Sequence, residues 1–262
     1  MQAAFKFDSA WALDPGGREY QEDALLSDVP ENADVGLVIL SDGMGGQAAG
    51  DVASNIVVSE AHATLGHDKS CVSTFEATIR DRLFAAVDAA NSSIREHVTR
   101  HPDTEGMGAT IVACALVNGS LYWISIGDSP LFLYRDGSLQ QLNEDHSLAP
   151  QIDFMADAGL IDRDEAREHP DRNVLTSVIF GGQIAKIDCP EHPVSLKEND
   201  IVIVGSDGLQ YLSDKELEDT IRKLETANSQ SIATHLMSQA TAIDDPDLDN
   251  VSFSVVKVKS AA

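Results

Sequence analysis

Asp-Gly dipeptides occur at three places in the sequence, at Asp42, Asp136 and Asp207. The usual role of such a dipeptide is a hairpin turn, and Asp136 stands between two short strand-like runs, as a hairpin requires. Asp42 and Asp207 instead follow buried-strand patterns and precede helical ones. A glycine after the aspartate lets the backbone approach an ion and offers its carbonyl as a ligand. We therefore interpret Asp42 and Asp207 as candidate metal ligands, and Asp136 as part of a turn.

Two further acidic segments widen the set of candidate ligands. Residues 18–23 (REYQED) place one arginine ahead of adjacent acids, and residues 244–250 (DDPDLDN) contain four aspartates. The second segment imitates the start of an EF-hand loop, but Asn250 and Val256 stand where that loop requires Gly and Glu. A calcium-binding structural protein is therefore not favoured.

The four acidic clusters have a shared chemistry, although any one of them could be a solvated loop or turn. They offer carboxylates without an organised Cys or His set. Such hard oxygen ligands suit Mg²⁺, Mn²⁺ or Ca²⁺ better than zinc or copper. A metal site that handles phosphate is the leading hypothesis.

The elements that would position these residues follow from the hydrophobic patterns. We expect strands at 35–40, 174–180, 200–205 and 251–258, an antiparallel meander over 109–142, helices at 47–65 and 72–97, a short helix pair within 148–168, and helices between 214 and 242. The first strand is expected to stop at Ser41-Asp42-Gly43. Blocks of strands and helices in this order predict an α+β sandwich rather than a regular parallel sheet.

Composition excludes several classes of protein. The chain has 262 residues with 43% hydrophobic residues, which is enough for one globular domain with a substantial core. Its formal charge of -25 disfavours nucleic acid and anionic membrane surfaces as partners. Its three cysteines form neither a disulfide framework nor a zinc pattern, and no apolar run is long enough to span a membrane. A cytoplasmic protein without a membrane anchor is expected.

Taken together, these motifs resemble the metal-dependent protein phosphatase family, the type 2C Ser/Thr phosphatases, in their bacterial single-domain form. The markers occur in the family's order: Arg18 with Glu22-Asp23, Ser41-Asp42-Gly43-Met44-Gly45-Gly46, Gly108-Ala109-Thr110, Gly127-Asp128-Ser129, Asp145-His146-Ser147, Ser206-Asp207-Gly208 and Asp249-Asn250. The resemblance implies a single catalytic domain over 1–262, built as a four-layer α-β-β-α sandwich of two antiparallel sheets flanked by helix pairs. It also implies a small flap subdomain at about 147–182.

The resemblance implies two core Mn²⁺ or Mg²⁺ ions and a third, weaker one. The expected ligands are Glu22, Asp23, Asp42, the carbonyl of Gly43, Asp128, Asp207 and Asp249. Asp42 would bridge the core ions, and Asp207 and Asp249 would complete the first site. Asp128 would hold the third ion together with Asp207, and the remaining ligands would serve the second ion, partly through water.

The same resemblance assigns catalytic roles to Asp42 and Arg18. Two bridged ions can activate a water molecule for attack on phosphorus, so no protein nucleophile is required. Arg18 would bind the substrate phosphate with its planar fork, which lysine would do less specifically. The acid that protonates the leaving group stays open between a metal-bound water and His146. Met44 stands where some relatives have a histidine proposed for this step.

The expected activity is hydrolysis of phosphoserine and phosphothreonine in proteins. Phosphorylated proteins are the expected partners, a cognate bacterial Ser/Thr kinase would supply them, and a monomer is expected. The alternative is a pseudophosphatase that binds phosphoproteins without cleaving them, and it predicts a damaged set of metal ligands. Asp42, Asp207, Asp249 and Arg18 are all present, which favours the enzyme. A relative that acts on anti-sigma antagonists is disfavoured, because such relatives usually lack the arginine.

Overall fold

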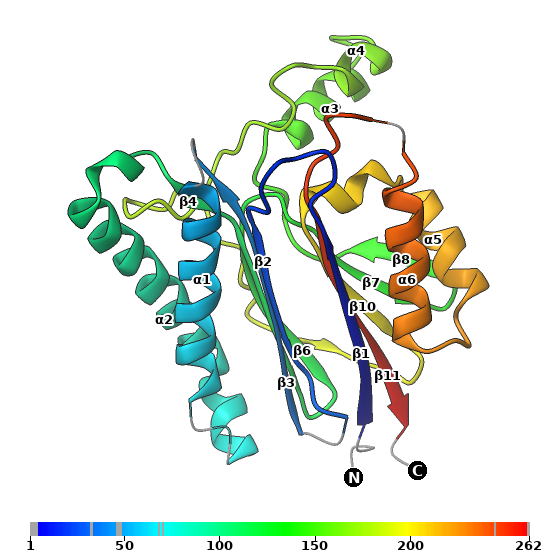
Figure 1. Cartoon of the computed structure of the whole chain (residues 1–262). Coiled ribbons are helices and arrows are strands. Elements are labelled where there is room, and N and C mark those ends of the chain that lie inside the picture. Colours follow the sequence, from blue (N-terminus) through cyan, green and yellow to red (C-terminus); the bar gives the residue numbers. More distant parts are fainter. Residues whose placement is uncertain are drawn as a thin grey trace.

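Two antiparallel sheets pack face to face, and each carries helices on its outer face (Figure 1). The computed structural model describes residues 5–31, 34–45, 49–67, 69, 71–243 and 245–260. This α-β-β-α arrangement confirms the fold class predicted from the sequence. Among the described residues, no helix combines the length and apolar character needed to cross a membrane.

The first sheet has the order β2-β3-β5-β6-β9, and β4 pairs with β3. Its strands are β2 (Asp23–Asp28), β3 (Val35–Met44), β4 (Gly108–Ala109), β5 (Ile111–Val117), β6 (Ser120–Ile126) and β9 (Val194–Ser195). Helices α1 (Ala49–Gly66) and α2 (Val72–Arg100) cover its outer face. A stripe of apolar side chains at helical spacing, including Phe75, Ile79 and Leu83, makes α2 pack against this layer.

The second sheet has the order β1-β11-β10-β7-β8. Its strands are β1 (Phe5–Asp14), β7 (Leu131–Arg135), β8 (Ser138–Gln141), β10 (Ile201–Gly205) and β11 (Val251–Ser260). Its outer face carries α5 (Asp214–Lys223), which begins with a Ser213/Glu216 capping box, and α6 (Ser229–Ala240). The first and last strands pair along their whole length, from Phe5 opposite Ser260 to Asp14 opposite Val251.

Continuous apolar runs in the strands reflect burial on both faces. In β3, Leu37 and Ile39 pack under α1 and α2, whereas Val38 and Leu40 face the second sheet. Because successive strand residues point to opposite faces, a strand between two apolar layers needs hydrophobic residues at every position. A third layer of buried apolar side chains lies between the second sheet and helices α5 and α6.

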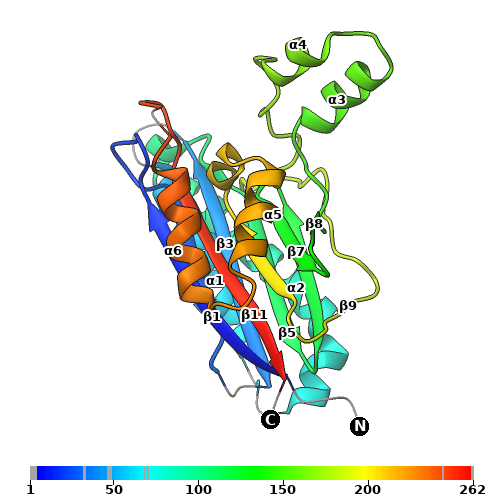
Figure 2. The ribbon, with the colours of Figure 1, turned by 90° about the vertical axis from the view of Figure 1, so that its right-hand side faces the viewer.

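Two short helices, α3 (Ala149–Asp157) and α4 (Arg163–Arg167), project from one end of the sandwich (Figure 2). They fall within the predicted flap at 147–182, and they confirm the predicted helix pair within 148–168. The 3-10 helix η2 (Asp207–Tyr211) follows β10, and another, η1 (Pro102–Thr104), follows α2.

Three sequence-based expectations about the strands are wrong. The region 109–142 is not one meander: β5 and β6 belong to the first sheet, β7 and β8 belong to the second, and the chain crosses between them at Gly127-Asp128. Residues 174–180 form no strand and make only isolated bridges, Ser147 with Leu175 and Ala109 with Ile179. β3 also continues through Met44, because Gly43 and Met44 pair with β4. The expected helix start at 47 lies outside the described residues, and α1 is described from Ala49.

Candidate active site

Strand ends bring carboxylates from both sheets together. Asp23 opens β2 and is the antiparallel partner of Asp42 near the end of β3. Asp207 follows β10 in the other sheet, and Asp128 follows β6 where the chain crosses between sheets. Thr110 fixes the backbone of Asp42, because its N–H donates to the Asp42 carbonyl (2.8 Å) and its Oγ1 accepts from the Asp42 N–H (3.0 Å). Asp42, Asp128 and Asp207 therefore line one cleft.

The glycines of the two Ser-Asp-Gly motifs are needed for close packing of the protein backbone. A Cβ at Gly43 would lie 1.9 Å from the carbonyl oxygen of Gly50 in the first turn of α1. A Cβ at Gly208 would lie 2.1 Å from the carbonyl oxygen of Asn250. Any side chain at either position would force these segments apart. These two glycines therefore pack directly against neighbouring backbone, a requirement that the sequence did not reveal, and Gly43 also lines the cleft.

Asn250 organises the loop that carries Arg18 and Glu22, a role that the sequence did not reveal. Its Nδ2 donates to the carbonyls of Pro15 and Tyr20, both at 3.0 Å, and its Oδ1 accepts from the N–H of Glu22 at 2.6 Å. One buried side chain thus ties the segment before β2 to the segment before β11. A polar residue directly before a strand was the available signal, but the three partners are distant in sequence.

Arg18 and Asp249 form an ion pair with Nη2 and Oδ2 2.8 Å apart. The side chains are 52% and 37% exposed, so the pair is open to solvent and to exchange of partners. The predicted phosphate ligand and one predicted metal ligand are thus each other's partners in this structure.

Burial and mutual repulsion raise the pKa values of the carboxyl groups at this site. Burial, with further contributions from neighbouring negative charges, raises the pKa of Asp23 and of Asp128 to about 7 in each case. The pKa of Asp42 is raised well above its usual range by burial first and then by the charges of Asp23, Asp207 and Asp128. Burial and the charge of Asp249 likewise raise the pKa of Asp207 and of Glu22.

This donor set fits divalent cations with a preference for oxygen ligands. Asp23 Oδ2 is buried without a hydrogen-bond partner, which is costly unless a cation or proton satisfies it. Like-charged carboxylates held together are stabilised by bound positive charge. Within the described ranges, however, no three acidic, His or Cys side chains already enclose a metal position. The set therefore has the chemistry of a metal site but needs side-chain adjustment to close around an ion.

The cleft has a volume of ≈ 520 Å³. Seven of the eight residues predicted for the site line it: Arg18, Glu22, Asp42, Gly43, Asp128, Asp207 and Asp249. The eighth, Asp23, is only 5% exposed. Asn173, Val174 and Leu175 also line the cleft, from the segment that follows α4 within the predicted flap range, although none of the three was predicted as a site residue.

A second cleft of ≈ 620 Å³ shares Asp128, Asp207 and Asp249 with the first and continues between the segment that carries α3 and α4 and the 3-10 helix η2. His146 lines neither cleft, whereas Met44 lines the first and is 44% exposed. Gly46 of the Ser41–Gly46 motif and Asp244 of the acidic loop lie outside the described residues.

The family model of protein phosphatase 2C matches residues 18–240. The chain belongs to the protein phosphatase 2C family. It is therefore a metal-dependent Ser/Thr protein phosphatase, which confirms the function predicted from its motifs.

Individual relatives agree with this family. A putative protein phosphatase 2C-type of Streptococcus pyogenes is 37% identical over 66% of this chain and 67% of its own length. The serine/threonine protein phosphatase PstP of Mycobacterium tuberculosis is 34% identical over 85% of this chain, which spans only 40% of PstP. The crystal structure of the PstP catalytic domain with two manganese ions has a TM-score of 0.77 and 29% identity, and the match covers 98% of this chain and 100% of that one.

Proposed function

We propose that the phosphatase reaction takes place in the carboxylate cleft, with two Mn²⁺ or Mg²⁺ ions as cofactors. The proposed ligands are Glu22, Asp23, Asp42, the carbonyl of Gly43, Asp207 and Asp249. When bound, the ions would supply an activated water molecule and positive charge against the phosphate. The observation that carries this proposal is the convergence of buried carboxylates with raised pKa values, among them Asp23 with its unpaired oxygen.

Asp42 is the proposed bridging ligand, because it lies beside acids of both sheets. The charges of Asp23, from the first sheet, and of Asp207, from the second, both act on it. Thr110 fixes its backbone. Asp128 is proposed as a ligand of a third, weaker ion together with Asp207, whose charge acts on Asp128 as well.

Arg18 is the proposed phosphate ligand. Its guanidinium is exposed, lines the cleft, and is paired with Asp249. A phosphate dianion is a strong partner for guanidinium, so the substrate would draw Arg18 away from Asp249. Asp249 would then be available as a metal ligand. Binding of the metal and of the phosphate would thus both favour separation of this ion pair.

Phosphoserine and phosphothreonine residues in proteins are the proposed substrates, and a Ser/Thr kinase would be needed to form them. We also propose that residues 1–262 act as one catalytic domain with a flap at about 147–182, that the protein is a monomer, and that it works in the cytoplasm. The pairing of the first strand with the last supports a single domain. The high negative charge supports the proposal that the protein binds neither nucleic acid nor anionic membranes.

Hydrolysis of a phosphothreonine peptide tests this function directly. We expect turnover by the wild-type protein with Mn²⁺ or Mg²⁺, none with a chelator, and loss of at least two orders of magnitude in Asp42→Asn. Asp136→Asn is the matched control, because Asp136 lies in the β7–β8 hairpin away from the cleft lining. A wild-type protein that binds the phosphopeptide but never cleaves it would support the pseudophosphatase instead.

A further inference from the structure

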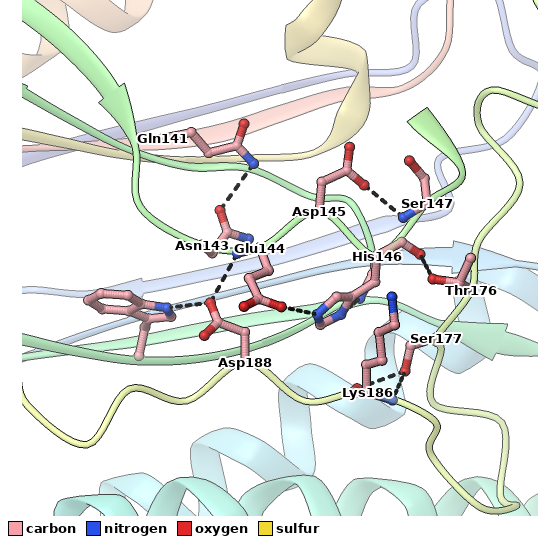
Figure 3. A network of polar contacts seen from close by, with 12 residues as sticks. Gln141, Asn143, Glu144, Asp145, His146, Ser147, Thr176, Ser177, Lys186 and Asp188 are labelled. Carbon is pink, nitrogen blue, oxygen red and sulfur yellow. Dashed lines mark hydrogen bonds and ion pairs between the residues drawn. The ribbon is translucent and has the colours of Figure 1, made fainter. Parts of the chain in front are cut away.

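His146 lies under the flap rather than in the cleft. Its side chain is 1% exposed, and it directly precedes the first residues of the flap. Figure 3 shows its ring surrounded by polar residues from several segments, with Glu144 directed toward the ring and Thr176 toward the backbone carbonyl.

The first set of contacts joins His146 to Gly127, the residue before Asp128. The His146 N–H donates to the Gly127 carbonyl at 3.0 Å, and the Gly127 N–H donates to His146 Nδ1 at 3.3 Å. Both backbone polar groups of Gly127 are thus held by one residue. Gly127 has a φ of +106°, and a Cβ there would lie 2.5 Å from the Thr110 side chain. The turn that carries Asp128 therefore lies between His146 and Thr110 and contacts both.

The second set of contacts joins His146 to the returning end of the flap. The His146 carbonyl accepts from the N–H of Thr176 at 2.7 Å and from its Oγ1 at 2.8 Å. Pairing continues into the flap, where Ser147 bridges Leu175 and the N–H of Leu148 donates to the carbonyl of Val174. Val174 and Leu175 line the cleft. His146 thus lies between the Asp128 turn and the wall of the cleft.

We propose that His146 is a positioning residue, which fixes the Asp128 turn and the flap's return segment relative to each other. The inference rests on the proposed role of Asp128 as a metal ligand. Nδ1 can accept the Gly127 N–H only while the ring is neutral with its proton on Nε2. Nε2 itself is buried without a hydrogen-bond partner, although Glu144 lies 3.8 Å away. The bond that the ring makes is therefore the one to Gly127.

Two substitutions separate positioning from simple core filling. His146→Asn keeps a hydrogen-bond acceptor at the place of Nδ1, whereas His146→Gln moves the amide outward and loses it. Loss of a residue that orients a metal ligand typically weakens metal binding by 10 to 100-fold. We expect His146→Gln to raise the Mn²⁺ concentration for half-maximal activity roughly tenfold or more, and His146→Asn to recover most of that loss.

His169 offers a matched control on the flap. Its Nδ1 also accepts a backbone N–H, from Asp171 at 3.2 Å, but it lines neither cleft. His169→Gln should leave the Mn²⁺ requirement unchanged. A double-mutant cycle with Asp128→Asn adds a second criterion, because a residue acting through Asp128 must be non-additive with it. Additive effects, or equal losses in the Asn and Gln variants of His146, would overturn the proposal.

Hydrogen exchange of the metal-free protein gives a readout that does not depend on activity. In His146→Gln, the amides of Gly127 and Thr176 should exchange faster than in the wild type. In His146→Asn, the same two amides should exchange at close to the wild-type rate. Unchanged exchange at both amides would contradict the positioning role. If the wild type shows no metal-dependent turnover, the proposed function fails, and the exchange data still decide the role of His146. If His146→Gln does not fold, His146→Asn is compared with the wild type instead. An increased Mn²⁺ requirement, or faster exchange of the Gly127 amide, in His146→Asn would then overturn the proposal.

Discussion

Replacing Asp128 by asparagine should stabilise the metal-free protein at neutral and alkaline pH. Asp128 is 8% exposed, and burial together with the charges of Asp207 and Asp145 raises its pKa from 3.8 to about 7. The folded protein therefore keeps this proton to a higher pH than the unfolded chain does. Stability of the wild type must fall as the pH rises from about 4 to about 7, because the unfolded chain releases the proton first.

The size of the effect follows from the raised pKa. Each pKa unit corresponds to about 1.4 kcal/mol, so between pH 5 and pH 7 ionisation of Asp128 costs the folded state on the order of 3 kcal/mol. Asparagine keeps the shape and removes the titrating group. The free energy of unfolding of Asp128→Asn should then exceed that of the wild type by an amount that grows by about 3 kcal/mol between pH 5 and pH 8.

Urea unfolding at pH 5, 6, 7 and 8 with a chelator present measures this difference. Asp136→Asn, at the exposed tip of a hairpin, is the control, and it should follow the wild type closely at every pH. Addition of Mn²⁺ should reverse the order, because the bound ion stabilises the wild type more than the variant. A constant difference between Asp128→Asn and wild type across this pH range would refute the electrostatic reasoning.

Two further substitutions test the cleft. Arg18→Lys should raise KM for a phosphothreonine peptide roughly tenfold, because an ammonium cannot bind two phosphate oxygens at once as the planar guanidinium does. Initial-rate kinetics measure this change, and an unchanged KM would count against phosphate binding by Arg18. Asn250→Ala should lower the free energy of unfolding by about 3 kcal/mol and weaken Mn²⁺ binding, because it removes all three bonds to the loop that carries Glu22. Urea unfolding and calorimetric Mn²⁺ titration measure both effects, and wild-type values in both would contradict the assigned role.

Much of the fold could be predicted from hydrophobic pattern, but pairing between distant segments could not. The run at 35–40 and both long helices were predictable, because one apolar layer covers each face of β3. Strand β1 was missed, since its edge position leaves residues such as Trp11 58% exposed and weakens the pattern. Residues 174–180 have the composition of a strand, yet that apolar character serves the cleft wall and the contact with Ala109.

The site was predictable where residue type alone determines the chemistry. Asp42 and Asp207 could be found from strand ends followed by glycine, and Asp23 is opposite Asp42 only because of the β2–β3 register. The ion pair of Arg18 with Asp249 spans 231 residues in sequence. No local pattern encodes such a contact, and the same holds for the backbone partners of Asn250.

The metal site itself is the central claim, and anomalous diffraction from crystals grown with Mn²⁺ tests it most directly. Two strong manganese peaks should appear in the cleft on either side of the Asp42 carboxylate, with Asp207 and Asp249 bound to one of them and Arg18 released from Asp249. The crystals of Asp42→Asn should lose at least one peak. Manganese bound elsewhere, or a cleft without manganese while Arg18 and Asp249 stay paired, would contradict the account.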